Sequence, residues 1–178
     1  MVSLLLALFS VLICLTSNGT VYANPNDRPP TLEESYLQLG YKSVEEAIKE
    51  FENHFNQDVK LPSTEPSIPF SHQFGRFYED KKFDVNDMLE IHFMDEKSPE
   101  NHYKIDIRPL KNKTTLKSKP NQTDYTLQDG QKALYLENML FNALFFDRGN
   151  WQYIISIDKR VSDKVNPEEL VRIANSIE

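Results

Sequence analysis

Four histidines are the residues in this sequence with the most versatile chemistry, because a neutral imidazole can ligate a metal ion or transfer a proton. They are His54, His72, His92 and His102. No two of them have the i, i+4 spacing that places a zinc-binding pair on one face of a helix. His92 and His102 lie in or beside one predicted hairpin, where we expect His92 to face Asp106 as an exposed pair. The sequence therefore predicts no metal site and no cofactor.

Nucleophilic and acid–base catalysis would need other residues in recognisable settings. Ser71 directly precedes His72, but the sequence contains no Gly-x-Ser-x-Gly, the pattern that exposes a nucleophilic serine. The acidic pairs Glu33-Glu34 and Glu45-Glu46 come at predicted helix starts, where the helix dipole favours negative charge. We expect these carboxylates to cap helices, and we expect no catalytic residue.

The predicted hairpin over residues 140–157 carries apolar side chains on both of its faces. Phe141 and Phe145 lie an odd number of positions from Phe146, so they point to the opposite side, where Ile154 joins them. One interpretation is a central hairpin covered by a helix on one side and by loops on the other. The other interpretation is an exposed patch of Phe141, Phe145 and Ile154 that binds a partner or a lipid-like ligand.

A capped amphipathic helix must position one side of this hairpin. Ser43 and Glu46 form a capping box, and apolar residues follow at helical spacing through residues 44–55. A shorter helix over residues 32–39 is expected to end at Gly40.

A second capped helix is predicted at the C-terminal end. Asn166 is a good N-cap, Pro167 suits the first helical position, and Glu169 follows in the first turn. An apolar stripe then continues to Ile177.

The first hairpin lies within residues 89–108, where apolar and polar residues alternate with the period of a strand. Folding it about its central loop places Ile91 opposite Ile107 on the buried side. The same register places Glu90 opposite Arg108 on the solvent side, and opposite charges across a ladder support it.

Turn residues set the other two hairpins. Asp129-Gly130 predicts a type I′ turn in a hairpin over residues 125–136. In the third hairpin, Arg148-Gly149 as the turn pair would place Phe146 opposite Trp151.

These elements predict an α+β fold. Pro62, Pro66 and Pro69 exclude helix and central strand, so residues 59–70 form an extended crossing segment before a strand over residues 74–78. The three hairpins form one antiparallel sheet, packed on one face by the N-terminal and C-terminal helices and wet on the other.

The segment before this domain has features of an export signal. An uncharged apolar run covers residues 4–15, and the residues up to Ala23 predict cleavage after Ala23. The run is shorter than the roughly 20 apolar residues of a membrane span. The basic residues of a typical signal are absent, so an uncleaved anchor formed by residues 4–16 is the alternative, and lipidation of Cys14 is a third. We expect a signal peptide over residues 1–23, a disordered spacer over 24–31 and a single domain over 32–178.

The charge and cysteine content narrow the function. The net charge is −7, which disfavours binding to nucleic acid or to anionic lipid. The only cysteine, Cys14, belongs to the signal, so the mature domain contains no disulfide and no thiol nucleophile. Membrane contact is expected only through the N-terminal segment, if it is uncleaved.

The C-terminal block resembles DUF4367, a bacterial domain family of unknown function. The similar features are the run Phe146–Tyr153 with its polar, glycine-containing turn, and a terminal helix ending Ile173-Ala174-Asn175-Ser176-Ile177. Leu61-Pro62, with Pro66 after it, resembles the start of the same domain, so the resemblance covers residues 59–177. It implies an extracytoplasmic domain of Gram-positive bacteria and no catalytic residue.

Together these patterns predict a non-enzymatic, extracytoplasmic interaction domain, secreted or in the cell envelope, whose partner is an envelope protein. The first alternative is a carrier or sensor of an apolar, lipid-like ligand. The second is a hydrolase with an unrecognised site.

Overall fold

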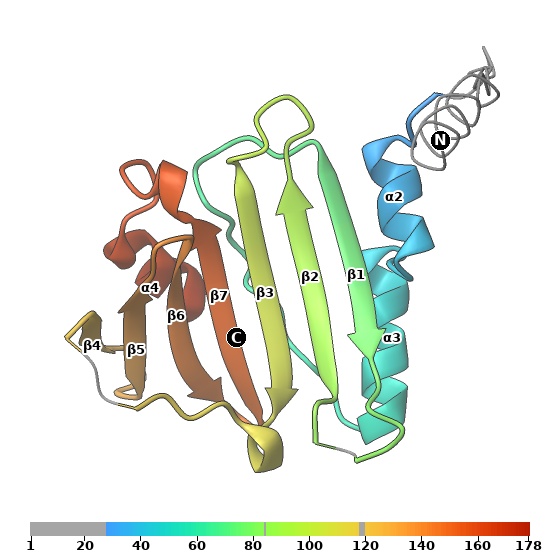
Figure 1. Cartoon of the computed structure of the whole chain (residues 1–178). Coiled ribbons are helices and arrows are strands. Elements are labelled where there is room, and N and C mark those ends of the chain that lie inside the picture. The colour runs from blue at the N-terminus through green and yellow to red at the C-terminus, as the bar shows by residue number, and fades with distance from the viewer. Residues whose placement is uncertain (1–27, 84, 118–119) are drawn as a thin grey trace, which may run out of the picture. The chain divides into compact units, whose positions relative to one another are not determined.

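The fold is built on an antiparallel sheet that the structure, a computed structural model, shows within residues 28–83, 85–117 and 120–178. In these ranges seven strands form one sheet in the order β1-β2-β3-β7-β6-β5-β4, and each neighbouring pair is antiparallel (Figure 1). The predicted signal, its cleavage after Ala23 and most of the predicted spacer lie outside the described residues. The strands are β1 (His72–Tyr78), β2 (Met88–Met94), β3 (His102–Pro109), β4 (Gln122–Thr126), β5 (Lys132–Glu137), β6 (Phe141–Arg148) and β7 (Trp151–Asp158).

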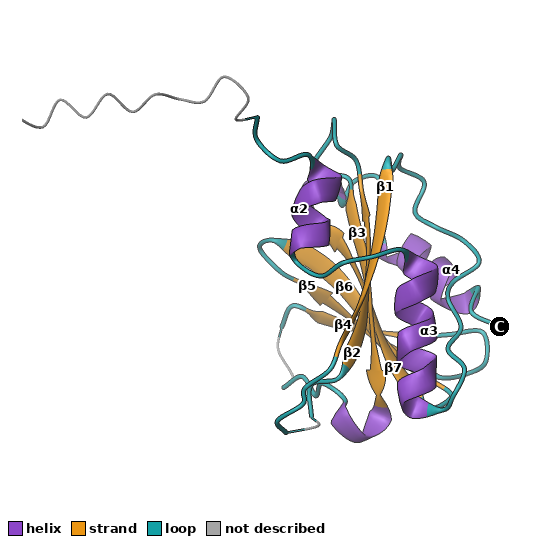
Figure 2. Ribbon diagram, turned by 90° about the vertical axis from the view of Figure 1, so that its right-hand side faces the viewer, coloured by secondary structure: helices purple, strands orange, loops and turns teal. Residues whose placement is uncertain are grey.

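Helices lie on both sides of the sheet. Figure 2 shows α3 (Val44–Phe55) and α4 (Pro167–Asn175) on one side, and α2 (Leu32–Gln38) on the other. Two short 3₁₀ helices, η1 (Leu110–Asn112) and η2 (Lys159–Val161), follow β3 and β7. The predicted α+β class is confirmed, with helices at the N-terminal and C-terminal ends. Because α2 lies on the second face of the sheet, that face is not exposed to solvent along its whole length, contrary to the prediction that it is wet.

The helix starts form as their sequences predict. Ser43 and Glu46 make the reciprocal capping box of α3. Asn166 Oδ1 accepts the backbone N–H of Glu169 at 2.9 Å and caps α4. The short helix α2 ends at Gln38, and Gly40 takes a φ of 84° just beyond it.

The core lies between α3, α4 and the inward side chains of the central strands. Phe51, Ile105, Ile155 and Leu170 are at most 1% exposed. Gly75 allows α3 to approach β1, because a Cβ at this position would lie only 2.7 Å from the Cβ of Ala47.

The proline-rich segment crosses this helical side without regular structure, as predicted. Trp151 Nε1 donates to the carbonyl oxygen of Asp58 at 3.0 Å, and the Tyr153 hydroxyl donates to that of Lys60 at 2.8 Å. These two bonds fasten the start of the segment to β7.

The register of the β2–β3 hairpin differs from the prediction by two residues. Ile91 pairs with Ile105 rather than Ile107, and Glu90 pairs with Asp106 rather than Arg108. The loop explains the difference, because Asp95 Oδ1 accepts the backbone N–H groups of Lys97 and Ser98, and the Asp95 N–H donates to the Asn101 carbonyl at 3.1 Å, which centres the turn on Ser98. A shift of two residues leaves every side chain on its predicted face.

The other two turns also differ from their predictions. In the β6–β7 hairpin the turn pair is Gly149-Asn150, so Phe146 pairs with Tyr153 rather than Trp151. Gly149 takes the positive φ that the first position of a type II′ turn requires. In the β4–β5 turn only Gly130 has a positive φ, so Asp129-Gly130 does not form a type I′ turn.

Candidate functional site

The candidate site is the face of the sheet opposite α3 and α4, which we call the open face. It has two halves. The polar cluster lies over β1, β2 and β3, and the apolar strip lies over β6 and β7. The polar cluster comprises Tyr41, Arg76, Glu90, His92, His102, Lys104 and Asp106, and the apolar strip comprises Phe141, Phe145 and Ile154.

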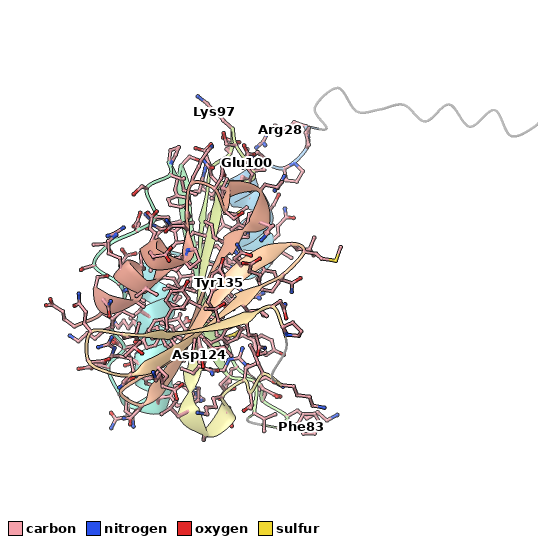
Figure 3. The ribbon with its side chains drawn as sticks, turned by 90° about the vertical axis from the view of Figure 1, so that its left-hand side faces the viewer. Arg28, Phe83, Lys97, Glu100, Asp124 and Tyr135 are labelled. Carbon is pink, nitrogen blue, oxygen red and sulfur yellow. The ribbon has the colours of Figure 1, made fainter. Side chains whose placement is uncertain are left out.

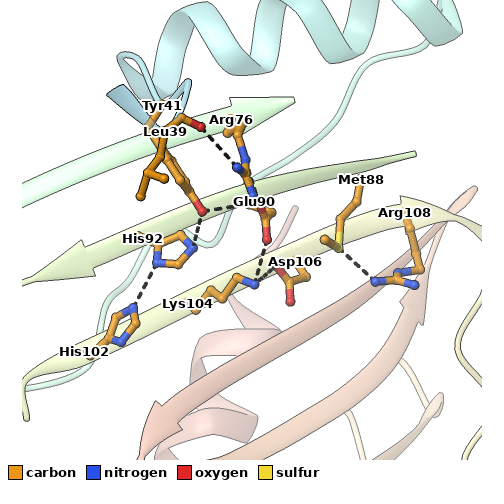
Figure 4. Close-up of polar contacts among 10 residues, drawn as sticks. All are labelled: Leu39, Tyr41, Arg76, Met88, Glu90, His92, His102, Lys104, Asp106 and Arg108. Atoms are coloured by element: carbon orange, nitrogen blue, oxygen red, sulfur yellow. Dashed lines mark hydrogen bonds and ion pairs between the residues drawn. The ribbon is translucent and has the colours of Figure 1, made fainter. Parts of the chain in front are cut away.

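The Glu90 carboxylate is the centre of the polar cluster (Figure 4). Glu90 is only 6% exposed and forms ion pairs with Arg76 and Lys104, whose Nζ lies 2.9 Å from Oε1. Lys104 Nζ also lies 2.9 Å from Asp106 Oδ1. Burial alone would raise the pKa of Glu90, but Lys104 and Arg76 lower it overall. The carboxylate is therefore a charged group that its neighbours already satisfy.

Two histidines extend the cluster toward the end of the hairpin. His92 Nε2 lies 3.1 Å from the Tyr41 hydroxyl, and His92 Nδ1 lies 3.0 Å from His102 Nε2. Burial, followed by the charge of Lys104, lowers the pKa of His92 to about 3. The rings of His92 and His102 stack on each other, with 5.1 Å between their centroids. His92, which lies between Tyr41 and His102 in this series of polar contacts, is therefore uncharged at neutral pH.

The prediction of an exposed His92–Asp106 pair is wrong. His92 is 8% exposed, and β-sheet pairing places it opposite Lys104, diagonal to His102. The difference has two causes, the register shift and coverage by the α2 region. In α2, Tyr36 stacks on Phe74 of β1 with 4.4 Å between the ring centroids.

Tyr41, which no motif in the sequence distinguishes, completes this cover. Its ring lies edge-on to His92 at 5.1 Å. The Arg76 guanidinium lies over the Tyr41 ring, 4.4 Å from the ring centroid.

The apolar strip borders an open groove. Phe145 pairs with Ile154 across β6 and β7, and Phe141 pairs with Asp158, so the three predicted patch residues share the open face. Ile154 is 9% exposed and Phe141 is 38% exposed. The groove has a volume of about 490 Å³. Its lining consists of His102, Lys104, Asp106, Thr114, Leu140, Phe141, Phe145, Ile154, Ser156, Ile157 and Asp158.

Sequence reasoning missed the polar wall of this groove. Lys104, Asp106 and Ser156 belong to β3 and β7, which are far apart in the sequence and adjacent in the sheet. Thr114 joins them because its backbone N–H and carbonyl both bond to the side chain of Gln152 in β7. Only the strand order brings the β3 side chains of Lys104 and Asp106 beside Phe145, whereas Ser156 belongs to the same hairpin as Phe145.

The remaining candidate chemistry has structural explanations. Ser71 Oγ lies 2.7 Å from His72 Nδ1, but it also accepts the backbone N–H of Glu96 and so holds the β2–β3 loop. His54 Nε2 lies 3.2 Å from the buried Asp87 carboxylate, whose other oxygen accepts the backbone N–H of Asp80. Both acidic pairs lie in first turns of helices, as predicted.

Within residues 28–83, 85–117 and 120–178, no three His, Cys, Asp or Glu side chains group as ligands for a metal ion. No helix in the same ranges is long and apolar enough to cross a membrane.

No family model, curated protein or solved structure matches this chain. The resemblance to the DUF4367 family therefore stays a prediction.

Proposed function

We propose that this chain is a non-enzymatic, extracytoplasmic binding domain that holds a small apolar ligand in the groove of its open face. The observation that carries the proposal is the groove itself, in which Phe141, Phe145 and Ile154 face a wall of polar side chains. The location outside the cytoplasm rests on the export-signal features of residues 1–23.

The size and lining of the groove favour a small molecule. Its volume of about 490 Å³ lies within the range of about 300–1,000 Å³ typical of ligand sites, which combine apolar walls with a few polar groups. Phe141 and Phe145 of β6 form the apolar wall of the groove, and Ile154 forms its floor. Polar side chains of β3 and β7 form the other wall. An apolar ligand entering here would bury surface that Phe141 now exposes to water.

The floor of the groove is rigid enough to be preformed. Ile154 is buried in β7, which pairs with β3 on one side and with β6 on the other. Side chains held by paired strands keep their geometry better than side chains on loops. The charged groups of the polar cluster already form ion pairs with one another, which favours a structural role for them over catalysis.

Fluorescence of the neutral probe N-phenyl-1-naphthylamine tests this proposal on the full chain. We expect saturable enhancement by the wild-type protein and its loss in Phe145→Asp, because a carboxylate in the apolar wall must be desolvated by the probe. Phe83→Asp is the matched control, since Phe83 is 64% exposed and projects from the lower end of the domain in Figure 3. Absence of saturable enhancement, or equal loss in both variants, would overturn the proposal.

A protein partner is the second candidate, because the turn beside the groove is unusually apolar. Met139 is 90% exposed and Leu140 is 77% exposed. The variant Met139→Ser, which lies outside the groove lining, would abolish reproducible capture of one envelope protein and leave probe binding intact if this turn is the contact. Unchanged capture would exclude it.

A further inference from the structure

The charges that line the groove are already paired within the protein. Lys104 lies 2.9 Å from both the Glu90 and the Asp106 carboxylates, and Arg76 supplies the second cation for Glu90. Asp158 accepts two bonds from the Arg160 side chain, at 2.9 and 2.7 Å. Each charged group in the polar wall therefore has a partner of opposite sign before any ligand enters.

The histidine of the wall adds no charge. His102 Nε2 lies 3.0 Å from His92 Nδ1, and burial lowers the pKa of His102. The wall presents His102 to the groove as a neutral imidazole.

Two hydroxyl groups in the lining of the groove are available to a ligand. Ser156 lies between Ile154 and Asp158 on the open face of β7, and Thr114 lies across the groove in the segment after η1. Within the described ranges, neither hydroxyl makes a hydrogen bond to another residue, and both residues are partly exposed. A hydroxyl can donate and accept, so it pairs with a neutral polar group as readily as with an ion.

We propose that the polar end of the ligand is uncharged, a hydroxyl or amide group, and that Ser156 receives it. This proposal rests on the proposed function of the groove. A charged end would lose its hydration and find no free counter-ion, because Lys104, Asp106 and Asp158 are each committed elsewhere. A hydroxyl or amide end exchanges its water for Ser156 without that penalty, while its apolar chain covers Phe145.

Three amphiphiles with the same chain test the proposal: decanol, decanoate and decylammonium, titrated into the full chain by calorimetry below their aggregation concentrations. We expect decanol to bind about tenfold more tightly than either ion, since burial of an unpaired charge costs more than burial of a bonded hydroxyl. Equal or tighter binding of decanoate or decylammonium would overturn the uncharged end and leave the binding domain standing. Failure of all three to bind would overturn the proposed function itself.

A charged substitution in the groove tests where the polar end of the ligand lies. Ser156→Lys adds a cation to the groove, so we expect decanoate to gain about tenfold in affinity relative to decanol. Thr123→Lys is the matched control, because it makes a similar exchange on the exposed strand β4, away from the groove. The same preference in both variants would contradict a role for Ser156. Circular dichroism spectra that match the wild type would show that both variants fold.

Discussion

The polar cluster and the groove occupy the same face of one sheet, yet they differ in what covers them. Over β1 and β2, Tyr36 and Tyr41 close the face, and the buried Glu90 finds two cations inside the protein. Over β6 and β7, Phe141 stays 38% exposed and borders a groove. Where this face is covered, its ionisable residues are held in ion pairs, and the uncovered apolar half is where we propose that a ligand binds.

Removing the central carboxylate should have the largest effect on stability. Glu90→Gln leaves the partly buried cations Arg76 and Lys104 without the buried carboxylate that they share, which should lower the free energy of unfolding by about 3–5 kcal/mol. Urea denaturation measures this loss. Glu50→Gln removes the more exposed ion pair with Lys42 and should cost less than about 1 kcal/mol. Similar losses in the two variants would mean that Glu90 is not the centre of a buried network.

Acid should weaken the polar cluster through His92. The unfolded chain protonates this histidine near its ordinary pKa of 6.5, whereas the folded protein does so only near a pKa of about 3. The unfolded state therefore binds more protons between these values, and stability is lost as pH falls from about 6.5 to 3, by on the order of 4 kcal/mol.

Denaturation curves at a series of pH values give this slope. Glu90 adds its own loss only below its ordinary pKa of 4.5, because its folded pKa is lowered. His92→Gln should therefore flatten the curve above pH 4.5 specifically. An unchanged slope in that window would assign the acid sensitivity to other groups.

Two neighbouring residues on β6 compare the covered and the open sides of the sheet directly. Leu144 is 0% exposed beneath the helices, so Leu144→Ala should cost about 2–5 kcal/mol. Phe145 borders the groove and is partly exposed, so Phe145→Ala should cost about 1 kcal/mol despite removing the larger side chain. Thermal denaturation of both variants checks the order. A reversed order would show that the strip belongs to the core.

The smallest stability effect is expected at the turn beside the groove. Met139 is 90% exposed, so Met139→Ser should change the free energy of unfolding by no more than about 0.5 kcal/mol. Chemical denaturation measures it. A clear destabilisation would mean that this turn packs against the domain rather than facing solvent.

Local signals predicted much of the fold and little of the site. Caps at Ser43 and Asn166 depend on residues three positions away, and they formed as expected. The predicted face of each strand residue was also confirmed in the β2–β3 hairpin, because apolar and polar residues alternate with a period of two. Registers were not, since a shift of two residues preserves alternation and only loop geometry decides between Ile105 and Ile107.

The groove illustrates the limit in physical terms. Phe141, Phe145 and Ile154 could be assigned to one face from spacing within a single hairpin. Lys104 could not be placed beside them, because the pairing of β3 with β7 joins segments separated in the sequence by η1 and the three strands β4, β5 and β6. Coverage of His92 by Tyr41 likewise depends on where α2 docks, and no spacing rule encodes it.

The most direct test of the central claim is an NMR titration of the ¹⁵N-labelled full chain with decanol. We expect the largest amide shifts at Phe145, Ile154 and Ser156, with small changes at Glu90 and His92. Shifts centred on Glu90 and His92, or no saturable shift at any of these amides, would contradict the assignment of binding to the uncovered half of the sheet.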